Sequence, residues 1–245
     1  MNIMKKISLF LFALTFAVGF SQSALALPAM QLDISDGTYN TATQTVDATT
    51  NPFTLSALVD SANASFDLNA TYYLAIALTP KVDDPTVDLG SFVFNGTTYN
   101  VPTDLTYGTP PDENVKKELA THGIYDTFYL QYEFKLDSTQ RSNAYNVQDD
   151  PGSLDPSANG QLYYMDFLVD VTNLSKDYGL HFDMYTLDKN GIAQFAPFSH
   201  DAQSTNGGGG TPNDPYTPAV PEPGTLFLLG GGLLGLIGVA RKIKR

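Results

Sequence analysis

Residues 127–136 read TFYLQYEFKL, a run in which every second side chain is large and apolar. One set of alternate positions holds Phe128, Leu130, Tyr132, Phe134 and Leu136, and the other holds Tyr129, Gln131, Glu133 and Lys135. A period of two is that of a β-strand, whose successive side chains point to opposite faces. The run therefore predicts a strand with one apolar face that covers a core.

Similar strand patterns recur on both sides of this run. They cover residues 53–59, 72–78, 162–171 and 180–187. Residues 72–78 are apolar almost throughout, as in a strand covered on both faces. Asn95-Gly96 lies between residues 92–94 and 97–101 and favours a type I′ hairpin turn. Short strands between turn clusters predict an all-β fold, an antiparallel β-sandwich of jelly-roll or immunoglobulin-like type.

The rest of the middle region adds one helix and a linker. Residues 112–120 have a helical pattern, with Asp112 as a suitable N-cap and Gly123 beyond the end, and predict a short connector helix. Residues 201–219 contain four consecutive glycines and three prolines, a composition that cannot bury a core. We therefore expect one β-domain over residues 27–200, followed by a linker over residues 201–219.

The N-terminal 26 residues have the pattern of a secretory signal peptide. Lys5 and Lys6 precede an apolar run over residues 7–20, and the small residues Ala24 and Ala26 follow it. The run is shorter than the about 20 residues that a membrane-spanning helix prefers. Signal peptidase is therefore expected to cut after Ala26, which removes the signal helix over residues 1–26.

The C-terminus combines a rigid tripeptide, an apolar run and a basic tail. Pro221 and Pro223 hold the backbone around Glu222 extended, in a form that a protease can accept. The following apolar run predicts a helix, and the basic tail that starts at Arg241 should stay in the cytoplasm. A helix over residues 225–240 is about 24 Å long, against a hydrocarbon core of about 30 Å. A sorting signal and an ordinary tail anchor both fit this pattern.

Residues 220–245 closely resemble the PEP-CTERM sorting signal, with Pro221-Glu222-Pro223 as its namesake tripeptide and Arg241 opening its basic tail. The resemblance implies processing by an exosortase, an inner-membrane protease of Gram-negative bacteria whose genomes usually also encode exopolysaccharide production. It also implies a precursor held briefly in the inner membrane with its domain outside the cytoplasm, and a mature form at the cell surface or outside the cell. The middle domain, for example residues 180–185, is similar to the so-called choice-of-anchor surface proteins, which imply no activity.

The net charge indicates which binding partners are unsuitable, and the cysteine count indicates what can stabilise the fold. Six of the 13 Lys and Arg and one of the 26 acidic residues lie in the two terminal segments, which leaves 7 basic and 25 acidic residues and a formal charge of −18 over residues 27–219. Nucleic acid is therefore a poor partner. The chain has no cysteine, so its stability must come from burial or from bound ions.

The residue types argue against an enzyme. The chain lacks a G-x-S-x-G elbow as well as cysteine, and its three histidines, His122, His181 and His200, match no zinc spacing and are expected to be structural. The glutamates of the exported part, Glu113, Glu118 and Glu133, fall on a short helix and on a polar strand face, where solvation explains them. We therefore expect no catalytic residues and no cofactor.

Two kinds of binding remain open. Asp149-Asp150-Pro151-Gly152 and Asp188-Lys189-Asn190-Gly191 are acidic turns that present oxygen ligands for calcium, although both are also common turn sequences. The chain has 14 tyrosines, and Tyr129 lies on the polar face of its strand, where it could stack on a sugar. The leading hypothesis is a non-enzymatic surface or matrix protein; the alternative is a carbohydrate-binding module for the cell's own exopolysaccharide. A secreted hydrolase is the weakest hypothesis.

Overall fold

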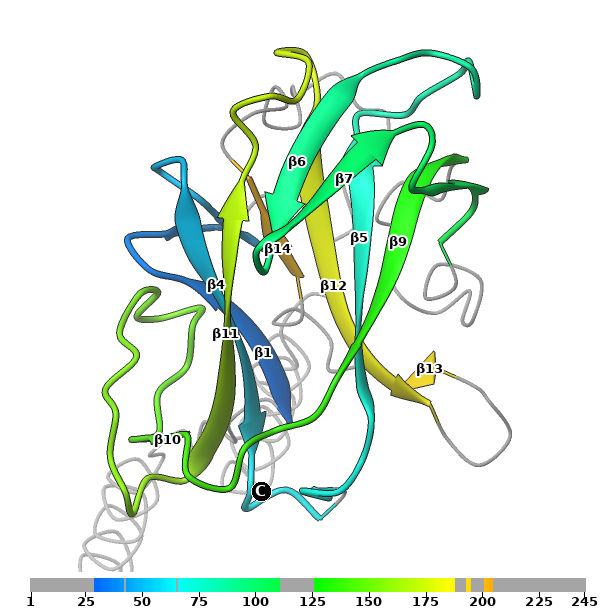
Figure 1. Ribbon diagram of the computed structural model, residues 1–245. Coiled ribbons are helices and arrows are strands. Elements are labelled where there is room, and N and C mark those ends of the chain that lie inside the picture. Colours follow the sequence, from blue (N-terminus) through cyan, green and yellow to red (C-terminus); the bar gives the residue numbers. More distant parts are fainter. Residues whose placement is uncertain are drawn as a thin grey trace, which may run out of the picture.

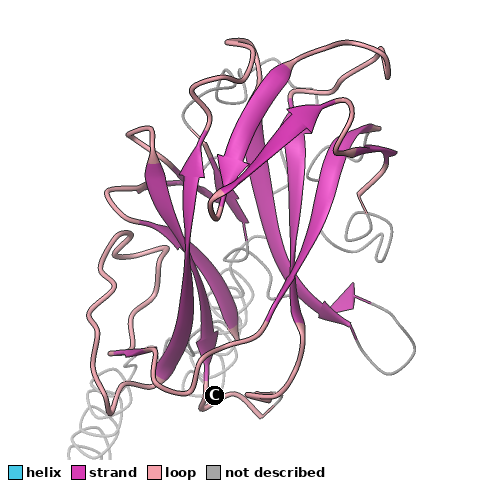
Figure 2. Ribbon diagram, viewed as in Figure 1, coloured by secondary structure: helices cyan, strands magenta, loops and turns pink. Residues whose placement is uncertain are grey.

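The computed structural model describes residues 29–41, 43–64, 66–110, 126–187, 193–194 and 201–204. All of these residues lie in strands, turns or loops (Figure 2), and none lies in a helix that could cross a membrane. The strands are β1 (Met30–Ile34), β2 (Thr38–Asn40), β3 (Thr45–Asp47), β4 (Phe53–Asp60), β5 (Tyr72–Thr79), β6 (Gly90–Phe94), β7 (Thr97–Val101), β8 (Thr106–Gly108), β9 (Thr127–Phe134), β10 (Arg141–Ser142), β11 (Leu162–Asp170), β12 (Gly179–Leu187), β13 (Ala193–Gln194) and β14 (Asp201–Gln203).

The strands form two sheets that pack face to face (Figure 1). Sheet A has the order β1-β4-β11-β6-β7, with β10 paired to β11. Sheet B has the order β2-β3-β14-β12-β5-β9-β8, with β13 paired to β12. One buried apolar cluster, drawn from both sheets, fills the space between them. The expected all-β sandwich is confirmed.

Sheet B differs from the expected antiparallel sheet at one pair, because β14 runs parallel to β3. β14 is antiparallel to its other neighbour, β12. The two neighbours of β14 therefore run in opposite directions, and a strand inserted between two such strands must be parallel to one of them. Sheet B is mixed for this geometric reason.

The strands expected at residues 53–59, 72–78, 127–136, 162–171 and 180–187 are present as β4, β5, β9, β11 and β12. The hairpin between β6 and β7 is also present. Asn95 and Gly96 have φ angles of 49° and 77°, the positive values that a type I′ turn requires. An asparagine tolerates this region and a glycine adopts it without strain, which explains why this pair forms the turn.

Aromatic rings from both sheets meet at the centre of the core. Phe94 of β6 lies 5.2 Å from Phe167 of β11 and 4.9 Å from Tyr132 of β9, measured between ring centroids. Phe182 of β12 lies 6.3 Å from Phe94 and 6.2 Å from Phe53. The apolar face expected for residues 127–136 therefore packs in the core. Binding sites are then to be sought on the outer faces of the two sheets.

The domain continues past residue 200, where the linker was expected to begin. Asp201–Gln203 form β14, and Ala202 is fully buried. The run is short and contains one apolar residue, so it carries no alternation that would mark a strand. The expected connector helix at residues 112–120 and the signal and sorting helices lie outside the described residues.

Candidate functional site

The outer face of sheet A carries a small polar pocket. Asp33 of β1 and Asp166 of β11 both pair in register with Ser56 of the intervening β4. The Ser56 hydroxyl donates a hydrogen bond of 2.6 Å to Asp166 Oδ1. These residues line a pocket of about 200 Å³ together with Ser35, Thr54, Gly152 and Leu154. The pocket therefore presents carboxylates and hydroxyls, which suit a cation or a hydroxyl-bearing ligand.

Asp33 forms one wall of this pocket and anchors a long loop over β1. Its Oδ1 accepts hydrogen bonds from the backbone N–H groups of Ile34 at 2.9 Å and Gly152 at 2.8 Å. Its Oδ2 accepts a 2.5 Å hydrogen bond from the Tyr145 hydroxyl. The neighbouring Gln31 accepts a hydrogen bond from the Val147 N–H. Two polar side chains of β1 thus fix the loop that covers the outer face of the strand.

Burial raises the pKa of Asp33 above its ordinary value of 3.8 and outweighs the hydrogen bonds, which lower it. The nearby Asp150 carboxylate also raises it. A carboxylate whose pKa is raised on folding binds its proton more tightly in the folded chain than in the unfolded chain. Its contribution to the free energy of unfolding is therefore complete below pH 3.8 and is lost as the pH rises through the raised pKa.

We expect the stability lost in Asp33→Asn to be larger in acid than at neutral pH. The difference in unfolding free energy between wild type and variant should fall as the pH rises from about 3.5 to about 7. Urea unfolding of both proteins at each pH measures this difference. Other carboxylates contribute equally to both proteins, so their effects cancel when the two free energies are subtracted. Asp84, whose pKa is lowered and which therefore acts in the opposite sense, is one of them. A difference that grows with pH would contradict the raised pKa of Asp33.

A larger pocket, of about 350 Å³, lies beside the start of β1 and the end of β12. Its walls include Phe66 and Tyr72, and its polar groups include Asp60 and Asn63. Phe66 stacks on Tyr163 at 5.0 Å between ring centroids. Asp60 Oδ1 accepts a 2.7 Å hydrogen bond from the Gln161 amide. An aromatic wall beside carboxylate and amide groups is the usual composition of a site for a small organic ligand.

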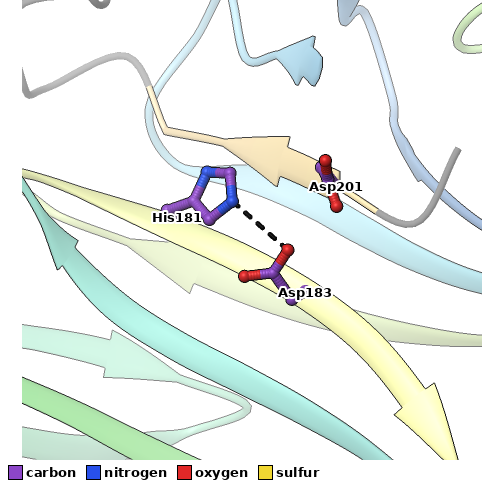
Figure 3. Close-up of side chains that lie close together, drawn as sticks. All are labelled: His181, Asp183 and Asp201. Atoms are coloured by element: carbon purple, nitrogen blue, oxygen red, sulfur yellow. Dashed lines mark ion pairs between the residues drawn. The ribbon is translucent and has the colours of Figure 1, made fainter. Parts of the chain in front are cut away.

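The outer face of sheet B holds a cluster of His181, Asp183 and Asp201 (Figure 3). One ligand atom from each of the three side chains lies within 4.8 Å of the others. His181 Nε2 lies 3.3 Å from Asp183 Oδ1, and Asp183 pairs in register with Asp201 on β14. Both aspartates are buried, at 3% and 1% exposed. We name these three residues the HDD cluster.

The HDD cluster also affects the pKa of Tyr39 on β2. Burial and, second, the negative charge of Asp201 raise the pKa of Tyr39 to about 12. The hydroxyl therefore keeps its proton at neutral pH.

The sequence does not predict the HDD cluster, because it indicates a structural role for His181 and places Asp201 in the linker. A signal exists for two of its members, because a histidine and an aspartate two positions apart share one face of a strand. The position of Asp201 depends on β14 joining β12, which sequence patterns do not show. His122 and His200 lie outside the described residues.

The acidic turn at residues 149–152 uses polar groups internally. The N–H groups of Asp149 and Asp150 both donate to the Asn146 carbonyl at 3.0 Å, and the Gly152 N–H donates to Asp33. Calcium binding at this turn stays a prediction. The second acidic turn, residues 188–191, lies outside the described residues.

The residues predicted for processing lie outside the described residues; they are Ala24, Ala26, Pro221, Glu222, Pro223 and Arg241. The signal peptidase site at Ala24 and Ala26 stays a prediction, whereas the C-terminal segment can be compared with known families. Residues 219–242 match the family model of the PEP-CTERM protein-sorting motif. No curated protein and no solved structure gives a significant match to this chain. The motif implies that an exosortase processes this protein at the membrane, and that the protein is exported and then located at the surface.

Proposed function

We propose that the β-domain is a non-enzymatic module that associates with the exopolysaccharide of the cell that exports it. The observation that carries the proposal is the sorting motif at residues 219–242, which directs the domain to the cell exterior. The precursor is held in the inner membrane with its domain outside the cytoplasm, after signal peptidase has cut at Ala26. Exosortase cleavage near Pro221-Glu222-Pro223 then separates the domain from its membrane helix.

The non-enzymatic part of the proposal is supported by the composition of the described pockets. The polar pocket on sheet A holds Ser56 beside two carboxylates, and its lining contains no histidine to act as a base. The larger pocket holds Asp60, which accepts hydrogen bonds from the Gln161 amide and the Ala62 N–H. A carboxylate held in this way serves to shape a loop rather than to transfer a proton.

Two aromatic surfaces favour binding to a polysaccharide. Tyr129 is half-buried on the outer face of β9, next to the exposed Gln131 and Glu133. Phe66 forms a wall of the larger pocket, beside the polar Asp60 and Asn63. Each surface combines a ring that can stack on a sugar with polar groups that can bind its hydroxyls. The acidic charge of the domain disfavours anionic polymers, so we expect a neutral polysaccharide.

We expect the full-length protein, solubilised in detergent, to be retained on immobilised exopolysaccharide of the producing cell. Removing the ring that carries the contact should weaken binding by about tenfold, because truncating a central aromatic residue of an interface costs more than about 1 kcal/mol. Tyr129→Ala and Phe66→Ala test the two surfaces separately, and Leu168→Ala, on the outer face of sheet A, is the control. No retention beyond that on the bare matrix would reject the proposal.

A further inference from the structure

The HDD cluster brings three side chains of metal-binding type to one place on two adjacent strands. His181 and Asp183 are two positions apart on β12, so both project from its outer face, while Leu180, Phe182 and Met184 project into the core. Asp201 reaches the same place from β14, because it pairs in register with Asp183. The backbone pairing of a rigid sheet therefore sets the spacing of the ligands in advance.

The distances suit a small divalent ion. Two ligands at about 2.0–2.1 Å from a tetrahedral zinc lie about 3.3 Å apart. His181 Nε2 and Asp183 Oδ1 are 3.3 Å apart, and the third ligand atom lies within 4.8 Å of both. A rotation of the Asp201 side chain that brings its carboxylate closer to the other two ligands, by at most about 1.5 Å, completes a three-ligand site and is within the range of ordinary side-chain torsions. The strands need not move.

The chemistry of the ligands and their burial select the kind of ion. Calcium takes six to eight oxygen ligands, and a set of one imidazole and two carboxylates supplies too few and includes a nitrogen. One imidazole nitrogen and two carboxylate oxygens suit zinc and manganese. Asp201 is 1% exposed and Asp183 3% exposed, so the ion would lie in a largely buried site, with a water molecule in the fourth position of a tetrahedral ion. Burial of two neighbouring carboxylates is costly, and a divalent cation between them offsets that cost.

We propose that the HDD cluster is a structural site for a divalent transition metal, with Zn²⁺ as its best-fitting ion, that fastens β14 to β12. β14 is three residues long and pairs with β12 over three positions and with β3 over two, so its backbone pairing is short on both sides. The chain has no cysteine and therefore no disulfide to fix this strand. A metal bound by His181 and Asp183 on β12 and by Asp201 on β14 would link the two strands as a disulfide does.

The competing interpretation is a charged triad without metal, in which a protonated His181 lies between the two carboxylates. Both interpretations explain the short distance from His181 to Asp183. They differ in stoichiometric metal uptake, since a protonated imidazole has no lone pair to offer an ion. Metal binding by the purified protein therefore separates them, and the result is independent of polysaccharide binding.

The experiment uses the full-length protein, prepared in detergent without a histidine tag and stripped of metal with EDTA. Titration with Zn²⁺ against a chromophoric chelator should give one ion per chain. Saturation should raise the melting temperature by about 5–10 °C, the shift expected for a ligand present at about 100 times its Kd. His181→Gln and Asp201→Asn should each weaken Zn²⁺ binding at least tenfold and abolish the thermal shift.

His122→Gln is the matched control, because it removes a histidine that is not part of the HDD cluster, and it should bind as wild type does. Mn²⁺ and Ca²⁺ are titrated in parallel. Tight binding of Zn²⁺ or Mn²⁺ that is lost in both cluster variants supports the proposal. It is overturned if the wild type binds neither ion stoichiometrically, if only Ca²⁺ binds, or if Asp201→Asn keeps wild-type affinity. The measurement on the wild type holds even if a variant does not fold.

Discussion

Replacing Pro221, Glu222 and Pro223 together by alanine should leave the protein full length in the inner membrane of a Gram-negative host that has an exosortase. The wild type should appear outside the inner membrane without the residues that follow the tripeptide. The tripeptide lies within the sorting motif over residues 219–242, which implies exosortase-dependent sorting, and we expect the tripeptide to be the part that the enzyme recognises. Two prolines in the sequence favour an extended segment, whereas alanine, the strongest helix former, favours a helix.

Intact mass and cell fractionation measure the outcome, since loss of the residues that follow Pro223 removes about 2 kDa from the chain. A host that lacks exosortase is the control, because wild type and variant should then behave alike. If the variant is cut and released as efficiently as the wild type, the tripeptide is not the recognition element. If the wild type also stays full length in the membrane of the exosortase host, the terminus is a plain anchor.

The strands could be predicted from the sequence because a period of two reports directly which side chains face the core. β9 is the clearest case: Phe128 and Phe134 are buried, and Gln131 and Glu133, on its other face, are exposed. The hairpin at Asn95-Gly96 was equally accessible, since its turn needs two residues that accept positive φ. Both signals are local, so neither depends on where the rest of the chain lies.

The arrangement of the strands could not be predicted in the same way, because it depends on long-range pairing. β14 has the sequence Asp-Ala-Gln, which carries no strand pattern, and its position between β3 and β12 is set by packing of Ala202 into the core. The linker boundary expected at residue 200 was wrong for this reason, and the parallel pairing of β14 with β3 in the otherwise antiparallel sandwich could not be predicted. A three-residue strand contains too few side chains to show a period.

The candidate sites, like the strands, could be predicted from the sequence only where the signal is local. The spacing of His181 and Asp183 is visible in the sequence, whereas their approach to Asp201 requires the pairing of β12 with β14. Asp33 and Asp166 are 133 positions apart along the chain and meet only because β4 lies between their strands. The absence of cysteine left burial and bound ions as the possible sources of stability, without indicating where an ion would bind.

Phe167→Ala should destabilise the domain more than any other change considered above. Phe167 is fully buried on β11, and its ring lies 5.2 Å from Phe94, 5.7 Å from Tyr132 and 5.3 Å from Phe134, measured between centroids. Removing such a ring costs about 3–5 kcal/mol, from lost burial and from the cavity left behind. Domains of this kind are stable by about 5–15 kcal/mol in total, so the loss is a large share. Thermal unfolding should show a fall in melting temperature of about 10 °C.

Leu168→Ala is the matched control, because Leu168 follows Phe167 on the same strand, points to the opposite face and is 54% exposed. Its truncation should change the free energy of unfolding by less than about 0.5 kcal/mol. The contrast between two adjacent positions tests the sandwich directly, since a one-residue shift in the register of β11 would exchange their environments. If Leu168→Ala is the more destabilising of the two, the apolar face of β11 has been assigned to the wrong side. If both variants are neutral, the rings of Phe94, Tyr132 and Phe134 do not converge on Phe167, and the two sheets do not share the core described for them.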